Sequence, residues 1–150
     1  MIRLIPRLLL ALALGFAAAA SAADPVYTGL LGNTAVSGYD AVAYHTDRNA
    51  VEGKEQFSAE WNGARWQFAS QAHLDAFKAE PAKYAPQYGG YCAYGVGEKN
   101  YLVKSDPQAW DIVDGKLYLN YDLGVQKLWK ADRNKLIKQA DERFPTLVSK

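Results

Sequence analysis

Two dipeptides in this sequence constrain its fold more than any other feature: Asn62-Gly63 and Asp114-Gly115. Both consist of residues that tolerate the positive φ angles of a tight hairpin turn. On both sides of each dipeptide, hydrophobic and polar residues alternate as they do along a strand with one buried face. The alternating positions are Phe57, Ala59, Trp61, Trp66 and Phe68 around the first dipeptide, and Trp110, Ile112, Leu117, Leu119 and Tyr121 around the second. We therefore predict two antiparallel β-hairpins.

Helical patterns accompany these hairpins. Residues 71–80 have the spacing of a short helix, with Ser70 as N-cap and Pro81 at its end or in the following turn. Residues 122–143 have the spacing of a longer amphipathic helix, which we expect Pro145 to end. Residues 36–46, "VSGYDAVAYHT", predict a bent or bulged strand. This order of elements favours a small α+β domain, in which two hairpins pack against a short helix and a longer C-terminal helix.

The N-terminus has the pattern of a secretory signal peptide over residues 1–22. Arg3 and Arg7 precede an apolar run over residues 8–20, and Ala20-Ser21-Ala22 supplies the small residues that a signal peptidase reads. The apolar run is shorter than the roughly 20 residues of a membrane-spanning helix, so we expect removal of the signal and no stable membrane span afterwards. The rest divides into an arm at residues 23–34 and one domain at residues 35–145, and we expect it in the periplasm or secreted.

Charge and motifs exclude several functions. The formal net charge is +1 at pH 7, and no basic run suggests a nucleic-acid partner. The sequence contains no nucleophilic serine elbow, phosphate-binding glycine loop, zinc-protease motif or paired-cysteine motif. The sequence therefore favours a binding protein over an enzyme without excluding an enzyme, and it does not identify a cofactor.

The one cysteine lies in "QYGGYCAYGVG", residues 87–97. An unpaired cysteine in an exported protein indicates a free thiol, an intermolecular bridge or a ligand, although many free cysteines are simply buried. The glycines around Cys92 allow backbone N–H groups to approach the sulfur, which favours the thiolate. No lysine, arginine or histidine lies within four residues of it.

The central part of the chain resembles the YHS domain family, in its exported bacterial branch. The residues that carry the resemblance are "VSGYDAVAY" (36–44), "WNGARWQFAS" (61–70), "AFKAEPAKYAPQYGGYCAYGV" (76–96) and "IVDGKLYLNY" (112–121). The resemblance implies a YHS-like domain over residues 35–145. Metal-handling members of this family hold soft ions with cysteines.

By that resemblance, Ala43 and Ala69 stand where two of the thiol ligands would be, and His73 stands at the third position. The usual thiolate site is therefore absent. Resembling proteins sometimes carry selenocysteine at the position of Cys92, which implies redox or soft-metal chemistry there.

Three functions remain open. In the first, Cys92 binds a soft metal ion, copper being the first candidate, with His73 or His45 as further ligands and Asp40 as a supplementary carboxylate. In the second, Cys92 is a redox thiol that reacts with a small thiol or oxidant. In the third, Cys92 is buried in a non-catalytic interaction domain. The aromatic residues could form core or line a ligand pocket; they include Trp61, Trp66, Tyr84, Tyr88, Tyr91, Tyr94, Trp110 and Trp129.

Overall fold

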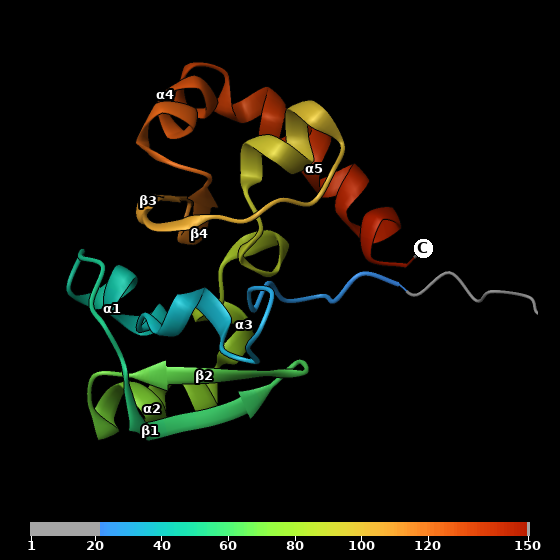
Figure 1. Ribbon diagram of the computed structural model, residues 1–150. Helices are drawn as coiled ribbons and strands as arrows, with labels where there is room; N and C mark the ends of the chain where they lie inside the picture. The colour runs from blue at the N-terminus through green and yellow to red at the C-terminus, as the bar shows by residue number, and fades with distance from the viewer. Residues whose placement is uncertain (1–21, 150) are drawn as a thin grey trace, which may run out of the picture.

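Both predicted hairpins are present in the computed structural model, which describes residues 22–149 (Figure 1). The strands are β1 (Lys54–Trp61) with β2 (Ala64–Phe68), and β3 (Asp106–Val113) with β4 (Lys116–Asn120). At the turns, Asn62 and Gly63 have φ angles of 51° and 79°, and Asp114 and Gly115 have 52° and 75°. These positive angles at both central residues make the two strands of each pair antiparallel neighbours, as the dipeptides predicted.

The helices surround the two hairpins and confirm the α+β class. In chain order they are the 3₁₀ turn η1 (Ala35–Gly38), α1 (Ala41–Thr46), α2 (Gln71–Ala79), α3 (Pro81–Tyr84), the 3₁₀ turn η2 (Gln87–Gly90), the π-helical turn η3 (Gly95–Lys99), α4 (Leu123–Ala131) and α5 (Arg133–Val148). The Ser70 hydroxyl caps α2 by accepting from the His73 N–H, as expected. Pro81 begins α3 at its first turn, where a missing N–H costs nothing.

Two hydrophobic cores lie on opposite sides of the β3–β4 hairpin. The N-terminal core includes Val42, Tyr44, Trp66, Phe68 and Phe77, and the C-terminal core includes Tyr88, Val96, Trp129, Leu136 and Ala140. In β4, Leu117 and Leu119 join the N-terminal core, whereas Tyr118 joins the C-terminal core. Because successive strand side chains point to opposite faces, one strand separates the two cores. Figure 1 shows this arrangement, with β1, β2 and α2 on one side of β3–β4 and α4 and α5 on the other.

The strand predicted over residues 36–46 is wrong. The segment forms η1 and α1, and its one β-type contact is an isolated bridge between Tyr39 and Glu52. The cause is Asp40, whose carboxylate caps α1 by accepting from the N–H groups of Val42 and Ala43. An N-cap of this kind satisfies helix donors that a strand would have left for a neighbour.

The single C-terminal helix predicted over residues 122–143 is divided in two. It breaks at Asp132, which has φ −138° and donates its N–H to the Trp129 carbonyl at the end of α4. Aspartate is favoured at such a cap over a helix interior. Pro145 does not end α5, which continues to Val148. Proline this close to a helix end removes only the bond to the Asp141 carbonyl and is tolerated.

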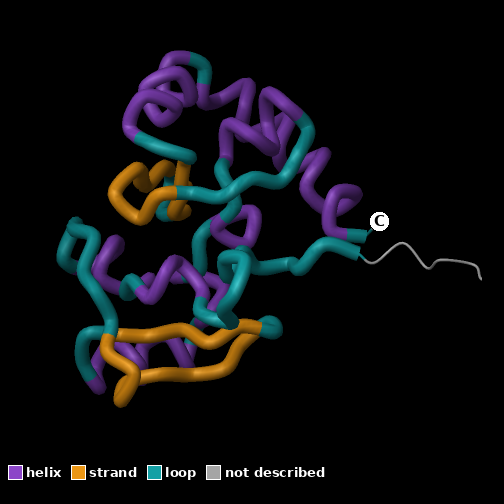
Figure 2. The backbone as a smooth tube through the Cα atoms, in the orientation of Figure 1, coloured by secondary structure: helices purple, strands orange, loops and turns teal. Residues whose placement is uncertain are grey.

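The arm at residues 23–34 contains no helix or extended strand (Figure 2). Val26 is buried, and the Tyr27 N–H donates to the Gly89 carbonyl. A Cβ at Gly89 would collide with the Pro25 carbonyl oxygen, so the arm can pass over this position only because it is glycine. The arm is thereby attached to the segment that joins the two cores. The predicted signal peptide lies outside the described residues, except for Ala22.

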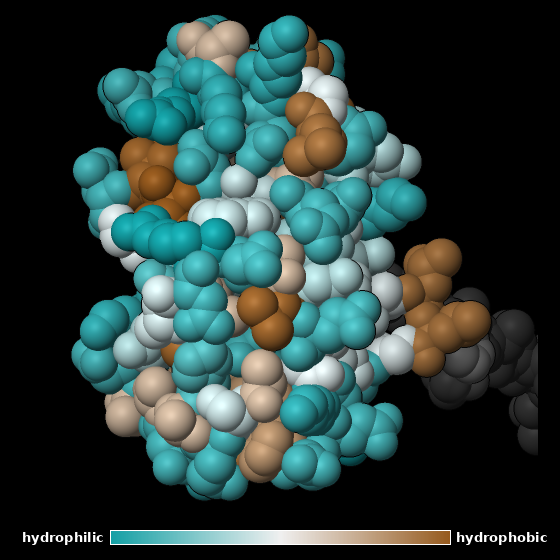
Figure 3. Space-filling view, turned by 90° about the vertical axis from the view of Figure 1, so that its left-hand side faces the viewer, coloured by the Kyte–Doolittle hydropathy of each residue, from teal (hydrophilic) through white to brown (hydrophobic). Residues whose placement is uncertain are grey.

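The surface bears few large hydrophobic side chains. On the face seen in Figure 3, hydrophilic residues predominate and the hydrophobic residues lie in separate patches. Among the described residues, the large hydrophobic side chains that are exposed are Leu30, Leu31, Tyr101, Tyr121, Leu123 and Leu128. Within residues 22–149, no helix combines the length and apolar character needed to cross a membrane.

Candidate functional site

Asp40 lies at the start of α1 with its carboxylate fully buried. One oxygen, Oδ1, accepts from the N–H groups of Val42 at 2.9 Å and Ala43 at 3.1 Å. The other, Oδ2, accepts from the Ala69 N–H at 2.8 Å. Three backbone donors therefore compensate the charge that burial takes out of water.

His73 completes this environment from the first turn of α2. Its Nδ1 lies 2.6 Å from Asp40 Oδ2, and because a carboxylate only accepts, Nδ1 carries the hydrogen. Its Nε2 faces Thr46 Oγ1 at 3.4 Å and lies 3.9 Å from Asp47 Oδ1. The Asp40–His73 pair thus ties α1 to α2, and it uses one of the two imidazole nitrogens.

Backbone donors of Ala43 and Ala69 both reach the same buried carboxylate. By resemblance, these two positions and His73 correspond to thiol ligands in metal-handling relatives. Here the three positions converge on Asp40 through hydrogen bonds. From the sequence we expected Asp40 only as a supplementary carboxylate ligand, and its pairing with His73 was missed. No local pattern signals this pairing, because the two residues come from separate elements.

His45 lies near the end of α1 and contacts α3. Its Nε2 is 3.3 Å from the Tyr84 carbonyl oxygen, and the two rings meet edge to face with centroids 5.4 Å apart. Burial lowers the pKa of His45, and the positive charges of Arg48 and Lys83 lower it further, whereas the hydrogen bond to Tyr84 acts in the opposite direction. The ring is thus held against its neighbour mainly in its neutral form.

Cys92 lies between η2 and η3, on the other side of the β3–β4 hairpin, and is 1% exposed. Its backbone N–H donates to the Val103 carbonyl. The thiol lies 3.8 Å from Asn120 Oδ1, and the Gly95 N–H donates to the sulfur at 3.4 Å. We call this second environment the Cys92–Asn120 pair.

Burial raises the pKa of the Cys92 thiol above its ordinary value. Backbone N–H groups of Gly95, Tyr121 and Tyr94 act in the opposite direction, and the Asp122 carboxylate adds to the increase. The backbone donors expected from the glycine-rich sequence are therefore present. They do not outweigh the loss of solvent, so Cys92 is a neutral thiol at pH 7.

Asn120 is the functional residue that sequence reasoning missed at this location. Its side chain is fully buried at the end of β4, and Oδ1 accepts from the Tyr94 N–H at 3.1 Å. Its Nδ2 has no hydrogen-bond partner within the described part of the chain. A signal existed: in "LYLNY" asparagine falls two residues after Tyr118, and so on the same face of the strand as Tyr118.

A pocket of about 200 Å³ adjoins the sulfur. Its lining residues are Cys92, Tyr94, Gly95, Tyr101, Val103, Tyr121 and Val125. Tyr101 and Tyr121 are exposed, so the pocket that Cys92 lines has surface residues among its walls.

The three metal ligands predicted from the sequence have separate surroundings. Cys92 contacts Asn120 and Gly95, His73 contacts Asp40, and His45 contacts Tyr84. Among residues 22–149, no three His, Cys, Asp or Glu side chains form a group that could hold a metal ion. One sulfur does not suit Zn²⁺, which takes four ligands in structural sites. It suits only a soft ion that accepts another ligand from outside the chain.

Comparison with known families identifies the N-terminal half of the fold. Residues 42–88 match the family model described as the YHS domain. This chain carries a YHS domain. The match runs from the second residue of α1 to η2, and so includes Ala43, His45, Ala69 and His73. No curated protein and no solved structure matches the chain.

Cys92 lies just beyond the matched YHS range, after η2. Of the Asp40–His73 pair, His73 therefore lies within the matched range, whereas Asp40 precedes it at the N-cap of α1. The Cys92–Asn120 pair belongs to the C-terminal half of the fold. The YHS match thus includes His73 of the first pair and neither residue of the second.

Proposed function

We propose that this YHS-domain protein is exported and binds a soft metal ion at Cys92, with Cu(I) as the first candidate. The observation that carries the proposal is the position of the Cys92 sulfur beside a pocket, with the Gly95 N–H directed at it. Thiolate is a ligand that Cu(I) prefers. The signal-like residues 1–22 support export from the cytoplasm.

In this proposal the chain provides one ligand of the metal ion, the Cys92 sulfur, and a small molecule from solution provides the second. His73 is engaged with Asp40, and His45 lies against the Tyr84 carbonyl, so neither is directed at Cys92. A small thiol entering the pocket between Tyr101 and Tyr121 could provide the second sulfur. Because the bound form is a thiolate, binding releases the thiol proton. Affinity therefore rises with pH as long as the thiol is protonated.

The experiment is a Cu(I) titration under reducing conditions against a colorimetric Cu(I) chelator, with and without a small thiol. We expect one Cu(I) per chain, tighter binding when the thiol is present, and loss of binding in Cys92→Ala. His73→Ala is the matched control and should bind as the parent does. Equal Cu(I) affinity of Cys92→Ala and the parent would refute the proposal.

The same geometry disfavours the redox alternative. A redox-sensing cysteine is accessible and has a lowered pKa. Cys92 is buried and burial raises its pKa. A metal ion can displace the proton from such a thiol, whereas an oxidant must find the thiolate already formed.

A further inference from the structure

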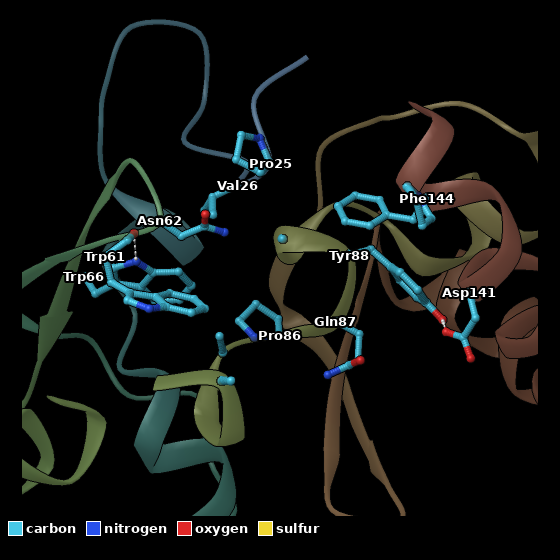
Figure 4. A pocket seen from close by; sticks show the side chains of 14 residues that line it. Pro25, Val26, Trp61, Asn62, Trp66, Pro86, Gln87, Tyr88, Asp141 and Phe144 are labelled. Carbon is cyan, nitrogen blue, oxygen red and sulfur yellow. Dashed lines mark hydrogen bonds between the residues drawn. The ribbon is translucent and has the colours of Figure 1, made fainter. Parts of the chain in front are cut away.

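A second concavity shares no lining residue with the pocket beside Cys92. It is a groove of about 420 Å³ along the junction of the two cores, which is a volume typical of small-molecule sites. Figure 4 shows Trp61 and Trp66 on one side and Tyr88 and Phe144 on the other, with Asp141 beside Tyr88. The first two residues come from the β1–β2 hairpin and the others from η2 and α5.

Two hydrogen-bond donors of these aromatic walls are already in use. Trp66 Nε1 donates to the Trp61 carbonyl at 2.9 Å, and the Tyr88 hydroxyl donates to Asp141 Oδ1 at 2.9 Å. Trp66 and Tyr88 are themselves buried, so the half-buried rings of Trp61 and Phe144 supply most of the accessible aromatic surface. Its remaining polar side chains, apart from Asp141, are the neutral amides of Asn62 and Gln87.

Asp141 is the one carboxylate among the lining residues, and no lysine, arginine or histidine lines the groove. Within residues 22–149, Asp141 forms no ion pair. A carboxylate has room for several donors, and the Tyr88 hydroxyl occupies only part of that capacity. The groove thus combines a negative charge at one end with aromatic surface along its length.

We propose that this groove binds an elongated organic cation. Its ammonium group would lie at Asp141 beside the Phe144 ring, and its apolar chain would extend toward Trp61 and Trp66. A cation is attracted by both the carboxylate and the ring faces. An anion would be repelled by the Asp141 carboxylate, and no basic residue lines the groove to offset that repulsion. A neutral ligand would remove water from the carboxylate without replacing the lost hydration.

Three probes of equal chain length test the charge preference: hexylammonium, 1-hexanol and hexanoate. Binding is followed by NMR of the four tryptophan indole N–H groups in the folded protein. We expect saturable shifts for Trp61 and Trp66 with hexylammonium, weaker shifts with hexanol and none with hexanoate. The signals of Trp110 and Trp129, which do not line the groove, should stay in place.

Asp141→Asn keeps an acceptor for the Tyr88 hydroxyl and removes the charge. It should weaken hexylammonium binding about fivefold, because Asp141 is exposed and solvent screens the attraction, and leave hexanol unchanged. Glu142→Gln removes the same charge from the neighbouring position, which does not line the groove, and should have no effect. From propylammonium to hexylammonium, affinity should rise about fourfold for each methylene that the groove buries.

The proposal is overturned if hexylammonium gives no saturable shifts at millimolar concentration, if hexanoate binds equally well, or if Asp141→Asn and Glu142→Gln have equal effects. Cys92→Ala should bind hexylammonium as the parent does. The groove proposal and the Cys92 proposal can therefore be refuted independently of each other.

Discussion

The Asp40–His73 pair and the Cys92–Asn120 pair are two buried polar environments in one small protein, and they differ in how completely their groups are satisfied. Asp40 accepts from three backbone N–H groups and from His73. In the second pair, Asn120 Nδ2 lacks a partner among the described residues and the thiol adjoins a pocket.

This difference separates a structural role from a binding role. A buried carboxylate whose hydrogen bonds are all made stabilises the arrangement around it, and it needs no ligand to do so. A neutral thiol and an unpartnered amide beside a pocket retain capacity for one. The Asp40–His73 pair is therefore the structural one, and the Cys92–Asn120 pair is the candidate for ligand binding.

The largest expected effect is at Asp40. Asp40→Ala orphans the N–H groups of Val42, Ala43 and Ala69 and the Nδ1 of His73, and we expect a loss of about 3–5 kcal/mol in the free energy of unfolding. Urea denaturation measures it. Asp47→Ala, at the exposed carboxylate near His73 Nε2, is the control and should cost under about 0.5 kcal/mol. Equal losses in the two variants would mean that the buried pair has no structural role.

The second prediction concerns the reactivity of Cys92. Because burial raises its pKa, the thiol should react at pH 7 with a disulfide reagent at least about tenfold more slowly than in the urea-unfolded chain. In the folded protein, the reaction rate should continue to rise as the pH passes the ordinary cysteine pKa of about 8.5. A rate that reaches a plateau below neutral pH would instead indicate a thiolate and revive the redox alternative.

Asn120 gives a smaller effect that sharpens the comparison. Asn120→Ala removes the acceptor of the Tyr94 N–H, but it also removes the buried Nδ2 that has no partner. The two contributions oppose each other, so we expect a net loss of only about 1 kcal/mol in the free energy of unfolding. Urea denaturation beside Asp40→Ala provides the measurement. A loss as large as that of Asp40→Ala would show that Asn120 is as fully engaged as Asp40.

The sequence predicted the parts of this fold that depend on near neighbours. Asn62-Gly63 and Asp114-Gly115 specify their turns through their own φ preferences, and Ser70 caps α2 from the adjacent residue. Asp40 misled the prediction because its cap turns an apparently alternating segment into a helix. Aspartate just before an apolar stretch was the available signal.

The candidate sites depend on long-range contacts and were predicted only in part. Cys92 was identified from its own residue type, but Asn120 reaches it from 28 positions away along the chain. Asp40 and His73 are 33 positions apart. The groove is assembled from two hairpin tryptophans, η2 and α5, so its acidic end at Asp141 has no local signature.

The smallest expected effect is the pH dependence contributed by His45, which lies within the matched YHS range but outside the Asp40–His73 pair. Burial lowers the pKa of His45 in the folded protein below the value of about 6.5 that it has when unfolded. As the pH falls through that value, the unfolded chain binds a proton that the folded chain does not, so stability decreases. The contribution is complete above neutral pH and is lost on acidification. The test is His45→Gln, whose amide can still donate to the Tyr84 carbonyl. The urea midpoint of each protein is measured at neutral pH and at a pH below the histidine range. The midpoint should decrease less in His45→Gln than in the parent. Other titrating groups affect both proteins alike, so identical pH profiles would show that His45 titrates equally in the two states.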